Sequence, residues 1–386
     1  MLERIYVDNY RCLVNFEFKP QRSQLIVGLN GAGKTTALDV LTMLRDFSIR
    51  GMACGDRLGR RSVTHWQSSD EQLFELDWRS DQGLYRYALQ IQPEDRQGSP
   101  GQGPVRVLRE EVTLEGKPLF LFGKGTIHLH NDRHEDKVQF QFDWRRSGMA
   151  IVEQRPDNTK LMAWKRWLGR VLHLQINPWT MTSRSEVEAT EPRRDMSNFA
   201  DWYRHLQLEK GDQVQNATVE LRDILPGFAT LRSREAGQNV RLLMAQLDSG
   251  SPYARPSFSP SDGTENDIAF DSLSEGQRCL ITLYVLLHCA VEQGRTILLD
   301  EPENFVALAE IQPWLLRFVD AVDEQGAQTI VVSHHPEVLN TLASGGAVVF
   351  DRPQGGPTRV SPFPVSTNEP LTPSEIVARG WERFGA

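Results

Sequence analysis

The chain has 386 residues, of which 39% are hydrophobic and 24% charged, and its formal net charge is -8. This length suits a large core that carries an insertion, and the negative charge excludes a protein that attracts nucleic acid or anionic lipid through its overall field. No run approaches the roughly 18 consecutive apolar residues of a membrane span, and the first residues lack the form of a signal peptide. We therefore expect a cytoplasmic protein with no membrane attachment.

Residues 1–150 are predicted to form a β-rich lobe that contains a glycine-rich turn. Short strands followed by turn residues, and then apolar residues at helical spacing, indicate a strand, turn and helix in that order. Period-two alternation further along predicts an antiparallel sheet, broken by a Gly/Pro-rich loop. The expected strands are 4–7, 16–18, 24–27 and several across 72–145, the helix includes 40–47, and the loop is 98–104.

Residues 151–235 are predicted to form an inserted helical lobe, because helical periodicity recurs over 161–171, 197–208 and 214–224. The remaining lobe, 236–386, returns to strands near Val240 and then alternates helices with apolar strands. The fold class is therefore α/β, with a parallel core.

The glycine-rich turn runs from Gly28 to Thr36 and matches the phosphate-loop pattern of Gly, four residues and Gly-Lys-Thr. Backbone N–H groups of such a turn face phosphates, Lys34 can reach the β and γ phosphates, and the Thr35 hydroxyl can ligate Mg²⁺. We therefore predict ATP and Mg²⁺ as ligands. The candidate nucleotide-binding residues here are Asn30, Gly31, Gly33, Lys34, Thr35 and Thr36.

Two adjacent carboxylates, Asp300 and Glu301, directly follow the apolar strand 296–299. The carboxyl end of a buried parallel strand is where such sheets collect their ligands. Asp300 is suited to hold hydrated Mg²⁺ beside Thr35, and Glu301 to deprotonate the attacking water.

Two further segments precede predicted helices. Ser274 and Gln277 form a capping-box pattern before an apolar helix over 278–290, and Ser333-His-His-Pro336 follows the strand 329–332. A serine hydroxyl at a helix N-terminus is suited to contact an anion. Pro336 is expected to begin the next helix.

The pentapeptide Leu273-Ser-Glu-Gly-Gln277 resembles the signature motif of ABC-type ATPases, with Glu275 in place of a glycine. This resemblance implies that Ser274, Gly276 and Gln277 contact the γ-phosphate bound to a second subunit, in a homodimer or higher homo-oligomer. It also implies that His334, rather than His335, is a catalytic switch histidine that senses the γ-phosphate.

Within that superfamily the chain resembles the soluble RecF, SMC and OLD-like ATPases. Asn9-Tyr-Arg11 is similar to their Asn-Phe-Arg segment, which implies that Arg11 approaches the nucleotide. Asp300-Glu-Pro-Glu303 resembles the form that the Walker B motif takes in OLD-like ATPases. OLD-like members often carry a histidine a few residues after this glutamate. Here Glu303 is followed by Asn304-Phe-Val-Ala-Leu308, which contains no histidine. Only about 50 residues follow His334, too few for a Toprim nuclease domain, so any effector activity is expected in another chain.

The resemblance implies an ATP-hydrolysing switch, associated with DNA or RNA in genome maintenance, DNA repair or anti-phage defence. One alternative is a nucleotide-gated scaffold or sensor that holds and releases a partner protein. Another is the ATPase subunit of a transporter, which the long insertion between Thr36 and Leu273 disfavours.

Weaker signals leave alternatives open. Histidines and aspartates near residue 130 could form a metal cluster, although a hairpin turn is favoured. Two basic segments could contact nucleic acid, although a solvated surface is favoured. The four cysteines lack metal or redox spacing and indicate reduced thiols, and Gln67 is the one candidate for the family's magnesium-linking glutamine. The histidines and aspartates are His128, His130, Asp132, His134 and Asp136. The basic segments are Trp164 to Trp167 with Arg170, and Arg57, Arg60 and Arg61. The cysteines are Cys12, Cys54, Cys279 and Cys289.

Overall fold

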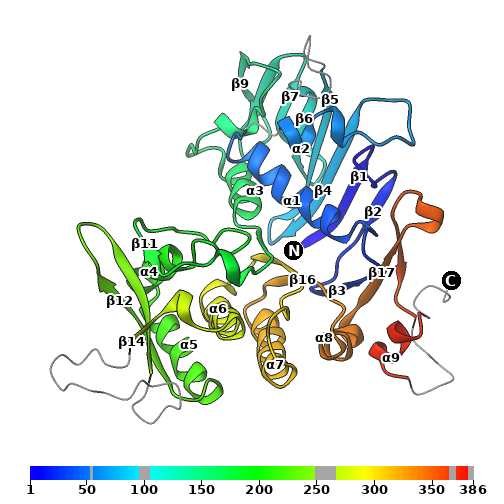
Figure 1. Ribbon diagram of the computed structural model, residues 1–386. Coiled ribbons are helices and arrows are strands. Elements are labelled where there is room, and N and C mark those ends of the chain that lie inside the picture. Colours follow the sequence, from blue (N-terminus) through cyan, green and yellow to red (C-terminus); the bar gives the residue numbers. More distant parts are fainter. Residues whose placement is uncertain (53–54, 95–104, 248–266, 365–370, 381–386) are drawn as a thin grey trace.

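The computed structural model describes residues 1–52, 55–94, 105–247, 267–364 and 371–380. The predicted loop at 98–104 and Cys54 lie outside these ranges. Figure 1 shows a β-lobe above a central α/β core, with a smaller lobe at the lower left. Across the described ranges, no helix is long and apolar enough to cross a membrane.

The β-lobe is an eight-stranded sheet in which every neighbouring pair is antiparallel, as the period-two pattern predicted. Residues 131–135 connect its last two strands, which confirms the hairpin, and the His128 imidazole contacts the Asp136 carboxylate across it at 3.0 Å. In sheet order the strands are β2 (Phe16–Phe18), β1 (Leu2–Asp8), β4 (Gln72–Ser80), β5 (Gly83–Pro93), β6 (Val105–Leu114), β7 (Lys117–Gly123), β8 (Thr126–His130) and β9 (Asp136–Gln141).

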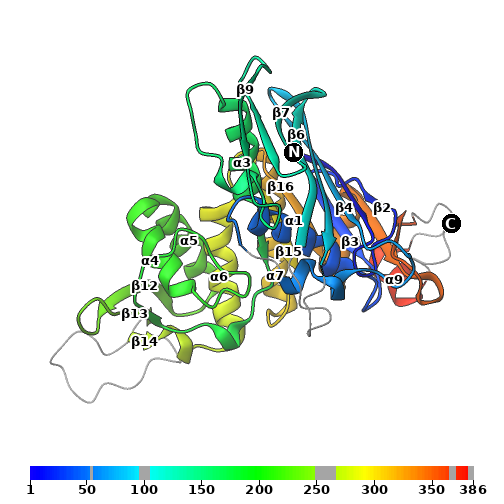
Figure 2. The same ribbon diagram turned by 90° about the horizontal axis from the view of Figure 1, so that it is seen from above.

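Helices α1 (Lys34–Ser48) and α3 (Thr159–Gly169) lie between this sheet and the core, and both views show α3 beside the β-lobe (Figures 1 and 2). Trp164 stacks on Tyr87, with ring centroids 4.7 Å apart, and Trp167 stacks on Trp78 at 5.1 Å. Both tryptophans are buried and stabilise the core. The favoured interpretation of a solvated surface is therefore wrong for these two residues, and they cannot stack on the bases of a nucleic acid. Short elements nearby are α2 (Gly55–Leu58), η1 (Arg60–Ser62) and η2 (Met149–Ile151).

The central sheet has six strands, parallel except for the last, and hydrophobic side chains cover both of its faces. Ile297 and Leu299 pack into the hydrophobic core on one face of the sheet, and Leu298 packs into the core on the other face. Because both faces are buried, successive residues of this strand are all apolar, as predicted for a parallel strand. In sheet order the strands are β10 (Leu172–Leu174), β15 (Thr296–Asp300), β16 (Gln328–Val332), β3 (Ser23–Val27), β17 (Ala347–Asp351) and β18 (Arg359–Pro362).

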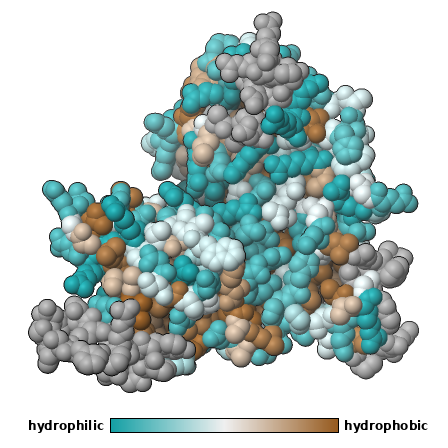
Figure 3. Space-filling view, viewed as in Figure 1, coloured by the Kyte–Doolittle hydropathy of each residue, from teal (hydrophilic) through white to brown (hydrophobic). Residues whose placement is uncertain are grey.

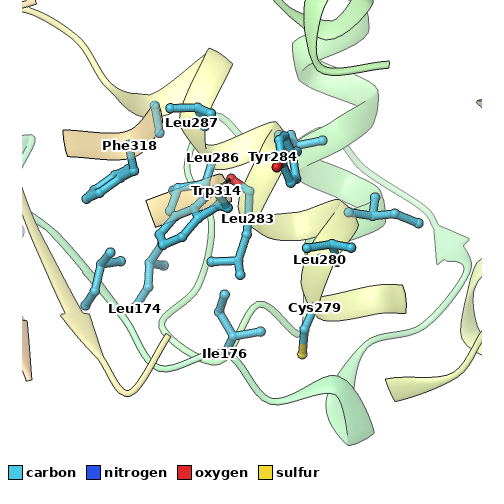
Figure 4. Close-up of a cluster of buried hydrophobic side chains, with 14 of the residues drawn as sticks. Leu174, Ile176, Cys279, Leu280, Leu283, Tyr284, Leu286, Leu287, Trp314 and Phe318 are labelled. Carbon is cyan, nitrogen blue, oxygen red and sulfur yellow. Dashed lines mark hydrogen bonds between the residues drawn. The ribbon is translucent and has the colours of Figure 1, made fainter. Parts of the chain in front are cut away.

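Helix α6 (Glu275–Ala290) is buried almost all round, as its composition predicted. Figure 4 shows its leucines packed with Leu174 and Ile176 beside Trp314 and Phe318 of α7 (Leu308–Glu324). The Trp314 indole donates a hydrogen bond to the Leu283 carbonyl at 2.8 Å, which joins the two helices. The chain continues through α8 (Pro336–Leu342), η5 (Ala343–Gly345), η6 (Pro353–Gly355) and α9 (Pro373–Ala378), so Pro336 begins a helix as predicted.

The segment 151–235 is less uniformly helical than predicted. Its helices are α3, α4 (Phe199–Glu209) and α5 (Gly211–Ile224), but it also contains β10, β11 (Arg184–Ser185) and β12 (Phe228–Glu235). Strands of two or three residues are too short to show periodicity, and β12 alternates weakly because its buried positions, Phe228 and Leu231, are three residues apart. Strands β11 and β12 belong to a third sheet, in which β13 (Arg241–Leu247) lies between them and also pairs with β14 (Asp267–Ala269). Two single turns complete the lobe, η3 (Pro178–Thr180) and η4 (Phe270–Ser272).

Figure 3 shows the face seen in Figure 1 as a mosaic in which hydrophilic residues predominate over the β-lobe. Hydrophobic residues recur over the lower part, where the small lobe and the core helices lie.

Candidate nucleotide site

The five parallel strands of the central sheet end at one edge, where β17 leads into Arg352. β3 leads into Gly28, β10 into Gln175, β15 ends at Asp300, and β16 leads into Ser333. A cavity of about 580 Å³ opens at this edge. Its walls are formed by Arg11, Cys12, Asn30, Gly31, Ala32, Gly33, Lys34, Thr35, Thr36, Arg61, Val63, Thr64, His65, Trp66, Asp300, Glu301 and Arg352.

The phosphate loop is held tightly against β17. Gly28 has a φ of +148°, and a Cβ there would lie 2.1 Å from the Phe350 carbonyl oxygen, so only glycine fits. The Lys34 ammonium donates to the Gly28 carbonyl and, at 3.0 Å, to the Leu29 carbonyl. Burial lowers the pKa of Lys34, which means that its charge lacks the solvation it would have in water. An anion in the cavity would compensate for that loss.

Asp300 and Thr35 lie together, although 265 residues separate them in the chain. The Thr35 hydroxyl donates to Asp300 Oδ2 at 3.0 Å, and Arg194 Nη2 lies 3.6 Å from the same oxygen. Burial raises the pKa of the Asp300 carboxyl, while the bond from Thr35 and the charge of Arg194 oppose that rise. A hydroxyl next to a carboxylate is the oxygen donor set that Mg²⁺ prefers.

Glu301 adopts a left-handed backbone conformation with φ of +51°, immediately after β15. Its N–H donates to the Val332 carbonyl at 2.9 Å, and its carboxylate accepts a bond from the Asn304 amide at 2.9 Å. Non-glycine residues in this conformation are strained and are common at functional sites. His334 Nε2 lies 3.9 Å from Glu301 Oε1, and burial, followed by the charge of Lys34, lowers the pKa of His334.

Glu303 forms a buried link between the two loops. Ser333 Oγ donates to Glu303 Oε1, and the His335 N–H donates to Ser333 Oγ at 3.0 Å. Glu303 is 6% exposed, and its Oε2 has no hydrogen-bond partner among the described residues. Burial raises the pKa of this carboxyl to about 7. Glu303 therefore holds the strand end of β15 against the segment that carries His334.

Glu303→Gln should make stability less dependent on pH. The folded protein binds this proton more tightly than the unfolded chain does, so the wild type should lose stability as pH rises from about 4.5 to about 7. At about 1.4 kcal/mol per pKa unit the full loss is roughly 3 to 4 kcal/mol, which the glutamine avoids while still accepting the Ser333 bond. Urea unfolding at pH 5 and pH 8 measures this difference. The exposed Glu209→Gln is the control, and an equal pH dependence in wild type and Glu303→Gln would contradict the prediction.

Asn9 and Arg11 have distinct places beside the cavity. The Asn9 side chain donates to the Ser69 and Glu71 carbonyls, and its oxygen accepts from the Thr64 N–H at 3.3 Å, so it positions the loop between η1 and β4. Arg11 lines the cavity, and its Nη1 lies 3.9 Å from Asp39 Oδ2.

Several lining residues carry no motif and were not predicted. The His65 and Trp66 rings lie in contact at a tilt of 37°, with centroids 3.9 Å apart. The Arg352 guanidinium lies 5.4 Å from the Trp66 ring and donates to the Gly31 carbonyl at 3.2 Å. Arg61, predicted only as a surface arginine, also lines this cavity, whereas Arg60 forms an ion pair with Asp70 at 2.8 Å.

Two glutamines can be compared for the predicted magnesium-linking role, and neither Gln67 nor Gln175 lines the cavity within the described part of the chain. The Gln67 amide donates to Asp8 at 2.9 Å. Gln175 follows β10, whose last residue pairs with Leu299, so Gln175 lies beside Asp300 at the sheet edge. It accepts a bond from Arg194 at 3.2 Å. In the sequence, Gln175 is marked only by its place directly after the short segment Leu172-His-Leu174.

Ser274 caps α6 through the predicted capping box, in which its hydroxyl accepts from the Gln277 N–H at 3.3 Å. Among the residues that the structure describes, Ser274, Gly276 and Gln277 do not line the cavity. A Cβ on Gly276 would lie 2.8 Å from the Phe305 carbonyl oxygen, so glycine lets the segment after Glu301 approach the helix. The Phe305 ring packs edge-on against Trp179, with centroids 5.1 Å apart.

These residues fit ATP and Mg²⁺. The cavity combines the start of a 15-residue helix, a desolvated ammonium and the exposed loop residues Asn30 and Gly31, which together suit a polyphosphate. Asp300 and Thr35 supply oxygen ligands for a hard divalent cation at the same place.

The fold is that of a nucleotide-binding P-loop ATPase of the ABC and SMC-head type. An SMC head solved in complex with the C-terminal winged-helix domain of ScpA is 12% identical, with a TM-score of 0.55, and the alignment covers 95% of this chain and 98% of that one. An SMC head domain from Thermotoga maritima is 13% identical with a TM-score of 0.45, covering 94% and 99%. At this identity the likeness concerns the fold alone.

A family described as AAA domain, putative AbiEii toxin, Type IV TA system matches residues 168–340. The matched segment includes Ser274, Asp300, Glu301 and His334, while the phosphate loop lies before it. A search of curated protein sequences finds no significant match. The ABC-type class expected from the motifs is thus supported by the fold, whereas the OLD-like branch remains a prediction.

Proposed function

We propose that the chain is an ATP-hydrolysing molecular switch that acts as a cytoplasmic homodimer or higher homo-oligomer. The observation that carries this proposal is the Thr35–Asp300 pair, 3.0 Å apart, in a cavity shared by Lys34 and Glu301. Binding groups for a phosphate, a divalent cation and a water nucleophile thereby meet at one edge of the sheet.

In this proposal Lys34 binds the β and γ phosphates, while Thr35 and Asp300 hold Mg²⁺, which when bound neutralises charge on the phosphates. Glu301 accepts the proton of the attacking water, and its contact with Asn304 orients the carboxylate. His334 is neutral at physiological pH because its pKa is lowered, so it can donate one hydrogen bond toward the γ-phosphate. Arg11, Asn30, Gly31, Gly33 and Thr36 complete the nucleotide contacts from the cavity wall. Gln175 is proposed to join the metal to the small lobe.

A second subunit is proposed to supply Ser274, Gly276 and Gln277. The exposed apolar surface beside them supports this: Trp179 is 70% exposed, Leu308 54% and Phe305 42%. An exposed cluster of large apolar residues marks interaction surfaces more often than free surface. Two-fold symmetry would bring each α6 N-terminus to the partner's nucleotide and bury both clusters.

Ser274→Arg should bind ATP as a lone subunit but hydrolyse it roughly 100-fold more slowly, because it loses one donor to the developing charge and adds a bulky cation at the interface. Light scattering with ATP and steady-state phosphate release measure both properties. Gln215→Arg, on the exposed side of α5 in the small lobe, is the matched control. Hydrolysis at the wild-type rate in Ser274→Arg would disprove the composite site.

A separate effector protein is proposed as the output of the switch. The description of the matching family as a putative toxin of a type IV TA system is consistent with a role in defence. DNA or RNA, with genome maintenance or DNA repair as the setting, is proposed on the resemblance to RecF and SMC ATPases. Because the chain carries a net charge of -8, any such contact must use local basic groups.

The alternative is a nucleotide-gated scaffold that holds and releases a partner without acting on nucleic acid. It is favoured by the likeness in fold to an SMC head bound to a winged-helix domain. A tagged pull-down with and without ATP, combined with ATP turnover with and without DNA, separates the two. Turnover that DNA does not change, with partner release that follows the nucleotide state, supports the scaffold.

A further inference from the structure

A second cavity, of about 800 Å³, is lined by residues from the end of α3, from β10 and from the segment before α4. One wall is the C-terminal half of α1, and the other is the segment that leads into α4. Its lining residues are Thr42, Arg45, Asp46, Arg50, Arg57, Gly169, Leu172, His173, Glu188, Ala189, Thr190, Glu191, Pro192, Arg193, Arg194 and Asn198. It is distinct from the nucleotide cavity, with which it shares no lining residue.

The lining contains five arginines but only three carboxylates, so positive charge exceeds negative charge there. Arg50 is shared between Asp46, at 3.3 Å, and Glu191, at 3.1 Å, and Arg57 reaches Asp46 at 3.4 Å. Arg193 is exposed at the rim. Arg194 is paired outside the lining, with Asp39 at 2.6 Å, so three carboxylates remain for the other four guanidinium groups.

His173 lies among these arginines and is only 3% exposed. Neither of its ring nitrogens has a hydrogen-bond partner among the described residues, and the nearest carboxylate oxygen, of Asp39, is 3.8 Å from Nδ1. An imidazole ring keeps at least one N–H, so His173 holds a buried donor that has no acceptor among the described residues. Leaving a buried donor unsatisfied is costly, and a ligand in the cavity would satisfy it.

We propose that this cavity binds a phosphorylated small molecule. Its phosphate would be held by the guanidinium groups of Arg57, Arg193 and Arg194, with the buried N–H of His173 as a further donor. The nearby carboxylates of Glu188 and Glu191 can accept hydrogen bonds from hydroxyl or amino groups elsewhere on the ligand. The same carboxylates would repel the continuous phosphate backbone of a nucleic acid, which favours a small ligand.

Arg194 connects this cavity to the nucleotide site. Its Nη1 lies 2.6 Å from Asp39 Oδ1, and its Nη2 lies 3.6 Å from Asp300 and 3.2 Å from the Gln175 oxygen. A phosphate that draws Arg194 toward the second cavity would remove a positive charge from Asp300. Occupancy would thereby change the affinity of Asp300 for Mg²⁺, so the ligand would act as an effector of the first site.

The experiment uses the full chain with Lys34→Ala, which weakens the phosphate loop, and isothermal titration with AMP, ribose 5-phosphate, pyrophosphate and inorganic phosphate. We expect saturable binding of at least one phosphorylated probe, and none of adenosine or ribose at the same concentration. In this background Arg57→Glu and Arg193→Glu should each weaken binding by about tenfold or more, because each removes a charge-assisted contact and adds repulsion. Arg232→Glu, an exposed arginine on β12, should leave the affinity unchanged.

Absence of saturable binding by every phosphorylated probe overturns the proposal. So does an equal loss in Arg232→Glu, or an unchanged affinity in both cavity variants, since binding would then take place elsewhere. If a short single-stranded oligonucleotide binds more tightly than every small probe and loses affinity in the same two variants, the arginines form a nucleic-acid surface instead, and the small-molecule proposal is wrong.

Discussion

Lys34→Ala should lose ATP binding almost completely. The ammonium is buried within the phosphate loop, where it contacts only the Gly28 and Leu29 carbonyls among the described residues, and it carries the charge that faces the β and γ phosphates. Hydrogen bonds to charged groups are worth about 1.5 to 3 kcal/mol each, so loss of two should weaken binding roughly 100- to 10,000-fold. Isothermal titration with ATP and Mg²⁺ measures the change.

Lys117→Ala is the matched control, because Lys117 is exposed on β7 and distant from the loop in sequence. It should bind ATP as the wild type does. Both variants should unfold at similar urea concentrations, since Lys34 contributes a desolvated charge rather than packing to the ligand-free protein. Wild-type ATP affinity in Lys34→Ala would refute the assignment of the phosphate loop.

Glu301→Gln should bind ATP but hydrolyse it about 100- to 10,000-fold more slowly, the range lost when a general base is removed. The glutamine has the shape of the carboxylate and can still accept the bond from Asn304. It cannot accept the proton of the attacking water. With ATP bound and not hydrolysed, the proposed closed dimer should accumulate, and light scattering with ATP should report about twice the monomer mass.

Glu324→Gln, on the exposed side of α7, is the control and should keep both the hydrolysis rate and the wild-type mass distribution. If a constitutive oligomer masks the change in mass, cross-linking between Ser274 and the phosphate loop of another subunit gives the same information. Hydrolysis by Glu301→Gln at the wild-type rate would exclude Glu301 as the base. Slow hydrolysis without added association would keep the base but contradict the ATP-dependent dimer.

The elements that could be predicted are those whose signal is local. The strand, turn and helix around Lys34, the capping box at Ser274 and the helix start at Pro336 each depend on a few consecutive residues with defined backbone preferences. The antiparallel β-lobe was predictable because its strands alternate over long stretches. Trp164 and Trp167 illustrate the limit: their composition suits a nucleic-acid surface, whereas the packing of α3 on Tyr87 and Trp78 makes them core.

By itself, the sequence determined which residues could contact a nucleotide, because phosphate chemistry restricts the residue types and their spacing within one loop. Only the tertiary structure decided which distant residues join them. The strand order places β10 beside β15, so Gln175 rather than Gln67 lies next to Asp300, and Arg194 lies between two cavities. No local pattern encodes that order, since neighbouring strands in a parallel sheet are connected through long crossovers, and their contacts depend on how the whole chain packs.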